Sequence, residues 1–255
     1  MAAAYGERLL QKDMSGPDVA ELQLRLAGFR GTLLDGEFGP GTEMQVQKFQ
    51  ADAMKMASPT RIVDGATFRA IDDFAKNFPI DFAQLKCRCG QCSGFGQQRF
   101  KGRYMPGGEG REVSNRYEYP GIHRLILWAT RALYFYMPEV KFTFSSGYRC
   151  SIDNQQHNRS TTNHHGKAVD IQPPRKPGLG ERDHMANCEA IRGLLVERSN
   201  AQVGWAAKNR KALESANDAP TWVHYDVREY ESKYLADAYF CTDQASLDHT
   251  LPIKV

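Results

Sequence analysis

The sequence lacks any apolar run that approaches the roughly 18 residues of a membrane-spanning helix, so we expect no stable membrane insertion. It also lacks a marked excess of charge of one sign. Its 33 basic and 30 acidic residues leave a net charge of +3, which is too small to indicate a nucleic-acid partner. The opening stretch, MAAAYGERLLQKDMSG, contains neither a basic leader nor a sustained apolar core. We therefore expect no secretory signal, and release from the cytoplasm would need another route.

The overall composition is that of an ordinary globular protein. A length of 255 residues predicts one large or two modest domains, and 41% hydrophobic with 25% charged residues excludes a disordered chain. The mildly basic pI of about 8.5 suits work against an anionic polymer surface. We expect a monomer.

Cysteine is scarce except in one segment. Three of the six cysteines lie in CRCGQC, at Cys87, Cys89 and Cys92. Spacings this tight favour a thiol-metal knuckle, or a hairpin of free thiols, over a disulfide scaffold. Cys150 and Cys188 are the candidates for a fourth ligand, and the sequence leaves the role of this group open.

The first 78 residues are predicted to form a small helical unit. In SGPDVAELQLRLAGF, apolar residues recur at helical spacing between Pro17 and Gly28, which are typical of a helix start and a helix end. LLDGEFGPGTEMQVQKFQ then predicts a turn and a second helix, and IVDGATFRAI repeats that scheme. In both copies Asp-Gly makes the turn, and Thr42 or Thr67 lies near the helix start.

This pattern resembles the peptidoglycan-binding-domain-1 family. The positions that match its pattern are Ser15-Gly16-Pro17-Asp18-Val19, Leu22-Gln23, Asp35-Gly36-Glu37-Phe38-Gly39, Thr42, Val46 and Phe49-Gln50. The resemblance covers about the first 75 residues. It implies a three-helix module whose partner is bacterial peptidoglycan.

The remaining chain is predicted to be a mixed domain over residues 121–255, preceded by a linker with loops at residues 79–120. A helix is expected from Gly121 to Met137 and another over residues 182–199, with strands at KFTFSS, KAVDI and WVHYDVR. GYRCSIDNQQHNRSTTN is predicted to be a long polar loop, a feature that usually carries function. The predicted fold class is α+β: a small N-terminal three-helix bundle and a C-terminal domain with an antiparallel sheet and flanking helices.

Residues suited to binding zinc surround the predicted strand KAVDI. A catalytic zinc takes three His, Asp or Glu ligands and leaves one position for water. His164 or His165 could fold back beside Asp170, whose carboxylate is unusual in an apolar strand and needs a partner. His224 in WVHYDV offers a third ligand.

In order along the chain, SSGYRC, the histidine before Gly-x-Ala-x-Asp and the later Val-His resemble a family of zinc peptidases. These enzymes cut D-alanyl and L-alanyl peptide bonds of peptidoglycan, and they include the VanX and VanY dipeptidases, D-Ala-D-Ala carboxypeptidases and many phage endolysins. The resemblance covers roughly residues 121–230. It implies a zinc cofactor.

The resemblance also implies the ligand set His164, Asp170 and His224. The family's first histidine stands three residues before the glycine, where this chain has Asn163. His164 is preferred to His165 because it lies nearer to the family's register.

The same resemblance implies a mechanism in which zinc lowers the pKa of its bound water to about 7. Arg149 would stabilise the oxyanion or hold a substrate carboxylate. Relatives usually carry glutamate three residues before the last histidine, and Thr221 occupies that position here. We take Asp218 as the general base, with Asp226 and Glu214 as alternatives.

The leading hypothesis is a peptidoglycan-degrading phage endolysin, a zinc peptidase that cuts stem or cross-link peptides of murein during host lysis. It would be made in the host cytoplasm and reach the wall, in the periplasm, after holin-type release. A bacterial D-Ala-D-Ala carboxypeptidase is the alternative within the same chemistry. A non-enzymatic wall-binding or virion structural protein is the alternative from another class, favoured by the shifted histidine and the missing glutamate. L-Ala-D-Glu, D-Ala-D-Ala and D-Ala-diaminopimelate bonds are all compatible with the sequence.

Overall fold

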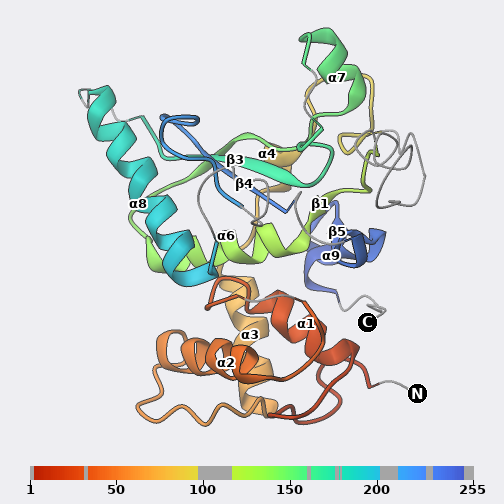
Figure 1. The fold of residues 1–255 in the computed structure, drawn as a ribbon, viewed down its shortest axis with the longest axis vertical. Coiled ribbons are helices and arrows are strands. Elements are labelled where there is room, and N and C mark those ends of the chain that lie inside the picture. The colour runs from red at the N-terminus through yellow and green to blue at the C-terminus, as the bar shows by residue number, and fades with distance from the viewer. Residues whose placement is uncertain are drawn as a thin grey trace.

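The computed structural model describes residues 3–31, 34–96, 117–159, 162–175, 178, 180–201, 212–227 and 232–249. In chain order its elements are α1 (Pro17–Arg25), α2 (Pro40–Asp52), α3 (Gly65–Asn77), α4 (Phe82–Leu85), β1 (Ile122–His123), α6 (Arg124–Tyr136), β2 (Thr143–Ser146), α7 (Ser151–Gln156), β3 (Ala168–Gln172), α8 (Glu181–Ser199), β4 (Val223–Asp226), the 3₁₀ helices η1 (Ser232–Leu235) and η2 (Asp237–Tyr239), β5 (Phe240–Cys241) and α9 (Gln244–Asp248). In Figure 1 the three N-terminal helices lie at one end of the molecule and the main sheet at the other, with α6 between them. Within the described part of the chain, no helix is both long and apolar enough to span a bilayer.

The N-terminal helices begin where the sequence predicts. Pro17 and Pro40 occupy the first turns of α1 and α2, where proline's missing N–H and fixed φ cost nothing. Asp64 caps α3, since its carboxylate accepts a hydrogen bond from the Thr67 N–H at 2.8 Å. The predicted three-helix bundle is confirmed.

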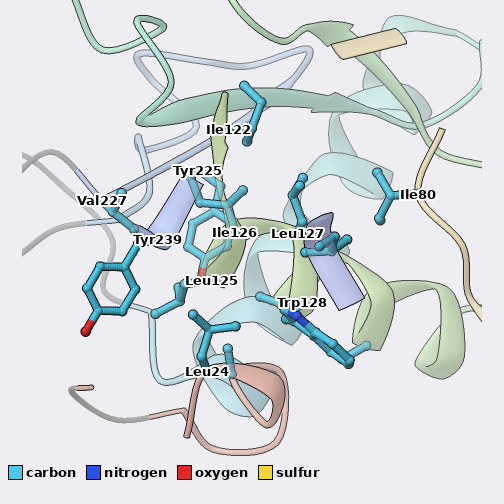
Figure 2. Packing of buried hydrophobic residues seen from close by; sticks show 14 of the residues in the cluster. Leu24, Ile80, Ile122, Leu125, Ile126, Leu127, Trp128, Tyr225, Val227 and Tyr239 are labelled. Carbon is cyan, nitrogen blue, oxygen red and sulfur yellow. The ribbon is translucent and has the colours of Figure 1, made fainter. Parts of the chain in front are cut away.

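Aromatic side chains fill the centre of the bundle. The ring of Phe29 packs edge-on against Phe49 and Phe74, with centroids 5.0 and 5.3 Å apart. Phe135 of α6 reaches the same cluster, 5.7 Å from Phe74. The apolar core of the N-terminal module therefore continues into the C-terminal domain. Figure 2 shows this continuity around α6, with Leu24 of α1 on one side and Tyr225 of β4 on the other.

The contact between α1 and α6 depends on close approach and on buried charge. A Cβ at Gly28 would lie 2.1 Å from the Cβ of Ala132, so only glycine fits there. Nearby, both carboxylate oxygens of Glu21 accept hydrogen bonds from Arg124, at 2.6 and 2.8 Å, and both side chains are fully buried. These two features fix the module against the helix that supports the sheet.

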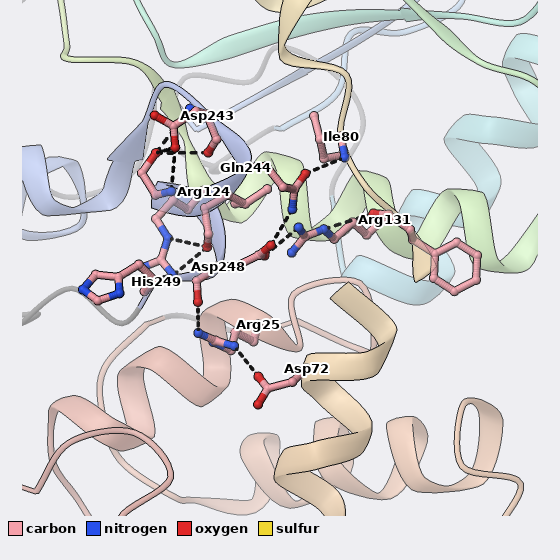
Figure 3. Close-up of polar contacts among 12 residues, drawn as sticks. Arg25, Asp72, Ile80, Arg124, Arg131, Asp243, Gln244, Asp248 and His249 are labelled. Carbon is pink, nitrogen blue, oxygen red and sulfur yellow. Dashed lines mark hydrogen bonds and ion pairs between the residues drawn. The ribbon is translucent and has the colours of Figure 1, made fainter. Parts of the chain in front are cut away.

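A second set of polar contacts joins the module to α9. In Figure 3 the guanidinium of Arg25 pairs with Asp72 of α3 and also donates to the carbonyl of Asp248. The carboxylate of Asp248 pairs with Arg131 of α6 at 2.6 Å. The end of the described chain is thereby tied to both parts of the molecule.

The C-terminal domain is built on an antiparallel sheet in the order β2-β3-β4. In its register Asp170 of β3 faces His224 of β4, and the pairing of β2 with β3 shifts register between Phe144 and Ser146. Helices α6 and α8 flank this sheet, and β1 and β5 form a separate antiparallel pair (Figure 1). The predicted α+β class is confirmed.

Three stretches differ from the sequence prediction. Part of the expected linker is packed structure, since Gln84 and Leu85 of α4 accept hydrogen bonds from the backbone N–H groups of Phe144 and Tyr148. The expected polar loop contains the short helix α7. The expected helix from Gly121 starts three residues later, because β1 first pairs with β5. Residues 97–116 of the expected linker lie outside the described residues.

Candidate metal centre

The sheet register brings three of the predicted site residues together. Asp170 and His224 are directly opposed on β3 and β4, and side chains in such pairs share one face of the sheet. His164 lies in the turn before β3, and its ring contacts that of His224 with centroids 5.3 Å apart. One ligand atom from each of the three residues lies within 4.8 Å of the other two. All three side chains are buried.

In His164 and His224, a hydrogen bond to one ring nitrogen leaves the other ring nitrogen facing Asp170. Nδ1 of His164 donates to the carbonyl of Gly147 at 2.7 Å, which leaves Nε2 facing Oδ1 of Asp170 at 3.4 Å. Nε2 of His224 lies 2.9 Å from Oδ2 of Asp226, and its Nδ1 lies 2.8 Å from the same Oδ1 of Asp170. A carbonyl and a carboxylate behind two imidazoles are the supports that orient metal-binding histidines.

Burial and the neighbouring charges shift the pKa values of all three residues. Burial alone would lower the pKa of His224, but hydrogen bonds to Asp170 and Asp226 outweigh it and raise the pKa to about 9. Burial likewise opposes ionisation of Asp170, yet the two histidines lower its pKa. Burial lowers the pKa of His164. Because a metal needs neutral imidazole, binding a metal at His224 releases a proton, and acid competes with the metal.

The donor set fits zinc. Two imidazole nitrogens and one carboxylate oxygen are a ligand combination of catalytic zinc sites, which leave a fourth position open. The supporting acceptors are in place on both histidines. The residues His164, Asp170 and His224 could therefore hold a zinc ion together, and the ligand set stays a prediction.

His165 faces a different part of the domain. Its Nε2 lies 3.2 Å from the side-chain amide of Asn154 in α7, and burial lowers its pKa to about 4. Its backbone carbonyl accepts from Tyr119. The structure thus brings His164, and not its neighbour, beside Asp170.

Arg149 lies at the edge of the candidate centre. Its Nη2 pairs with Oδ2 of Asp170 at 2.6 Å, and its Nε donates to Ser146 at 2.7 Å. The side chain is 20% exposed, so it also reaches an open cavity of about 240 Å³. The charged residues that line this cavity are Lys86, Arg88, Arg149, Arg159 and Asp153, with His157 beside them.

The structure gives the three candidate bases different surroundings. Asp218 is exposed in the turn before β4, where its carboxylate accepts from the Ser215 hydroxyl at 2.6 Å. Asp226 is buried against His224. Glu214 uses its backbone carbonyl to accept from Arg192. The contacts described for Asp218 stay within its own turn, so its role as the base stays a prediction.

Gly147 is a site residue that the sequence did not single out. A Cβ there would lie 2.4 Å from the carbonyl oxygen of Leu85, so the approach of α4 excludes any side chain. The backbone is then free to present its carbonyl to His164. The only available signal was the glycine within SSGYRC, which gives no hint of this hydrogen bond.

Comparison with known proteins shows similarity in both parts of the chain. Residues 15–71 match the family described as "Putative peptidoglycan binding domain". The zinc D-Ala-D-Ala carboxypeptidase of Streptomyces albus G is 28% identical over 194 residues, covering 72% of this chain. The alignment covers 66% of that relative, so this chain spans slightly less than two thirds of its length. Both resemblances inferred from the sequence are confirmed: residues 15–71 match the peptidoglycan-binding family, and the chain is distantly similar to a zinc carboxypeptidase.

Proposed function

We propose that this chain is a zinc-dependent peptidase that hydrolyses peptide bonds of bacterial peptidoglycan and is held on the wall by its N-terminal module. The observation that carries the proposal is the convergence of His164 Nε2, Asp170 Oδ1 and His224 Nδ1 on one buried point. A zinc ion bound there supplies an acidified water and a polarised scissile carbonyl. The matched binding domain and the carboxypeptidase relative support peptidoglycan as the substrate.

Arg149 and the adjoining cavity suit an anionic substrate. The guanidinium is held by Asp170 and Ser146, so it is ordered before substrate arrives and can donate to a carboxylate or to a developing oxyanion. Lys86, Arg88 and Arg159 add further positive charge to the cavity wall. Stem peptides of peptidoglycan carry free carboxylates, which this wall would attract. Asp218 is our proposed general base.

The biological setting that we propose is host lysis by a phage endolysin. The chain would be made in the host cytoplasm and reach the periplasmic wall through a holin-type pore. An N-terminal binding module followed by a peptidase supports this reading. A D-Ala-D-Ala carboxypeptidase is the second candidate, and the Streptomyces albus G relative favours it.

Mass spectrometry of digested murein tests the proposal. Purified murein would be treated with wild type, His164→Ala and His165→Ala, and the zinc content of each protein measured. We expect His164→Ala to lose one zinc per chain and all peptide release, because His164 adjoins Asp170. His165→Ala is the matched control and should keep that zinc.

The fragments identify the bond. Separation of cross-linked peptides indicates an endopeptidase, and release of D-alanine alone indicates a carboxypeptidase. Chelation should abolish release and added zinc should restore it. Binding to murein without any release by zinc-loaded wild type would contradict the enzymatic proposal and leave a wall-binding protein.

A further inference from the structure

Four cysteine side chains converge at a second point, next to the cavity but separate from the histidine site. The sulfurs of Cys87, Cys89, Cys92 and Cys150 all lie within 4.8 Å of one another. The Sγ of Cys150 is 3.6 Å from that of Cys87 and 3.5 Å from that of Cys89. All four are free thiols. A disulfide would need sulfurs about 2.05 Å apart, so the spacing is that of a group around a common centre.

The sulfur spacing fits a tetrahedral metal. Zinc binds thiolate at about 2.3 Å, which places the sulfurs of a tetrahedral four-cysteine site roughly 3.8 Å apart. The observed separations of 3.5 and 3.6 Å are close to that value. Cys87 and Cys89 both direct a sulfur to this group, while Arg88 between them is exposed.

Backbone donors surround the sulfurs. Each of the four sulfurs accepts one backbone N–H: Cys89 from Gln91 at 3.3 Å, Cys92 from Gly94 at 3.3 Å, Cys87 from Cys150 at 3.4 Å and Cys150 from Asp153 at 3.4 Å. Burial raises the pKa of the Cys87 and Cys150 thiols, and these hydrogen bonds partly offset it, because hydrogen bonds to the charged form of a group favour that form.

The turns that create these donors require glycine. Gly90 and Gly94 have φ values of +71° and +101°, in the region that side chains disfavour. The N–H of Cys87 also donates to the carbonyl of Gly94 at 2.7 Å, which closes the segment into a compact knuckle. Cys150 is completely buried and the others are half-buried or nearly buried. The group is therefore shielded, yet close enough to solvent for a metal to enter.

We propose that Cys87, Cys89, Cys92 and Cys150 form a structural zinc site, with the four thiols losing their protons as the ion binds. With four sulfur ligands no position is left for water, so the site is structural and not catalytic. This inference does not depend on the proposed peptidase activity. The other two cysteines, Cys188 and Cys241, lie outside the group.

The proposed zinc joins two segments that are 63 residues apart in sequence. One is the knuckle of residues 87–94, which contains Arg88 and directly follows Lys86. The other is the start of α7, where Cys150 follows directly after Arg149 and caps the helix through Asp153 N–H. Both segments line the cavity of about 240 Å³. The ion would hold the cavity walls, and the backbone of Arg149, at a fixed separation.

Cobalt substitution and zinc counting test this site. Thiolate ligands give cobalt a charge-transfer absorption that a site of two histidines and an aspartate lacks. We expect this absorption in wild type, and equally in His224→Ala, in which the histidine site is disabled. We expect wild type to hold one zinc more than Cys92→Ser, and Cys188→Ser to match wild type as the buried-cysteine control.

The outcomes separate this site from the catalytic one. If Cys92→Ser does not fold, the cobalt spectrum of wild type and of His224→Ala still tests the proposal. Absence of the charge-transfer band, or thiols that react equally fast with and without a chelator, would overturn it. Iron in place of zinc in the purified protein would overturn the choice of metal. Loss of murein cleavage with the band retained counts against the proposed function alone.

Discussion

Asp226 lies behind His224 on the same strand, with its Oδ2 2.9 Å from Nε2 of the imidazole. The two residues are two positions apart in β4, which places their side chains on one face. This contact leaves Nδ1 of His224 directed at Asp170. A buried carboxylate thus holds the ring in the orientation that a metal ligand needs.

Replacing the Asp226 carboxylate should lower the affinity for zinc more than it lowers the catalytic rate of the zinc-loaded protein. We expect Asp226→Asn to lower zinc affinity at the histidine site by about 10- to 100-fold, measured by competition with a chromophoric chelator. Saturating zinc should then restore most of the activity. A variant that binds zinc normally but stays inactive would instead make Asp226 the base.

For Asp218 we expect the reverse: its replacement should lower the catalytic rate and leave zinc binding unchanged. As the proposed general base, Asp218→Asn should lower kcat by about 10²- to 10⁴-fold, with the zinc content unchanged because none of its described contacts reaches the ligands. Ser215→Ala, which removes the hydroxyl that bonds Asp218, is the control and should retain most of the activity. An unchanged kcat in Asp218→Asn would exclude it as the base.

Arg149 should matter for catalysis without being needed for the metal. We expect Arg149→Lys to lower kcat/KM by about 10²- to 10³-fold, because a lysine cannot reproduce the fork that contacts both Asp170 and Ser146. Arg159→Lys is the matched control, since Arg159 lines the same cavity but pairs with Asp153. If kcat/KM fell equally in both variants, Arg149 would contribute only positive charge to the cavity and would have no specific role in catalysis.

Acid should destabilise the fold through His123. Burial lowers the pKa of His123 from 6.5 to about 4. Its Nε2 donates to the Tyr234 carbonyl, and its Nδ1 accepts from the Leu125 N–H, so the folded protein has no place for a second ring proton. Between pH 6.5 and 4 the unfolded chain binds a proton that the folded protein excludes. The free energy of unfolding should therefore fall by about 3 kcal/mol over that range and change little below it on this account.

Urea denaturation at a series of pH values checks this dependence. His123→Gln, which cannot titrate, should be less stable than wild type at pH 7 but should lose less stability on acidification. Parallel curves for the two proteins would show that other groups are responsible for the acid sensitivity.

The buried ion pair between the module and α6 should be costly to break. Glu21→Gln leaves the guanidinium of Arg124 buried without its carboxylate, which should lower the free energy of unfolding by about 3–5 kcal/mol. Asp73→Asn removes the exposed partner of Lys76 and should change the free energy of unfolding little, because solvent screens an exposed ion pair. Denaturant titrations of both variants make the comparison. Similar small losses would mean that solvent reaches Glu21 in the unmutated protein.

Local sequence patterns predicted much of the secondary structure. Proline at the starts of α1 and α2 and the capping Asp64 are signals that act within one helical turn, so those helices could be predicted from the chain alone. The strand KAVDI also followed from its composition. The segment around α4 could not be predicted, because its structure depends on hydrogen bonds that the Gln84 side chain and the Leu85 carbonyl accept from Phe144 and Tyr148, in a distant part of the chain.

The sequence by itself determined the longer helices α1, α2, α3, α6 and α8, the three strands of the main sheet and the residue types able to bind zinc, because these depend on short-range spacing and side-chain chemistry. Only the tertiary structure decided which residues meet. Asp170 and His224 are 54 residues apart, and it is the pairing of β3 with β4 that opposes them. Cys150, and not Cys188, joins the knuckle because α7 starts against it, while Cys188 is buried in α8. Such partnerships depend on the packing of distant segments, whose geometry is not encoded in any local pattern.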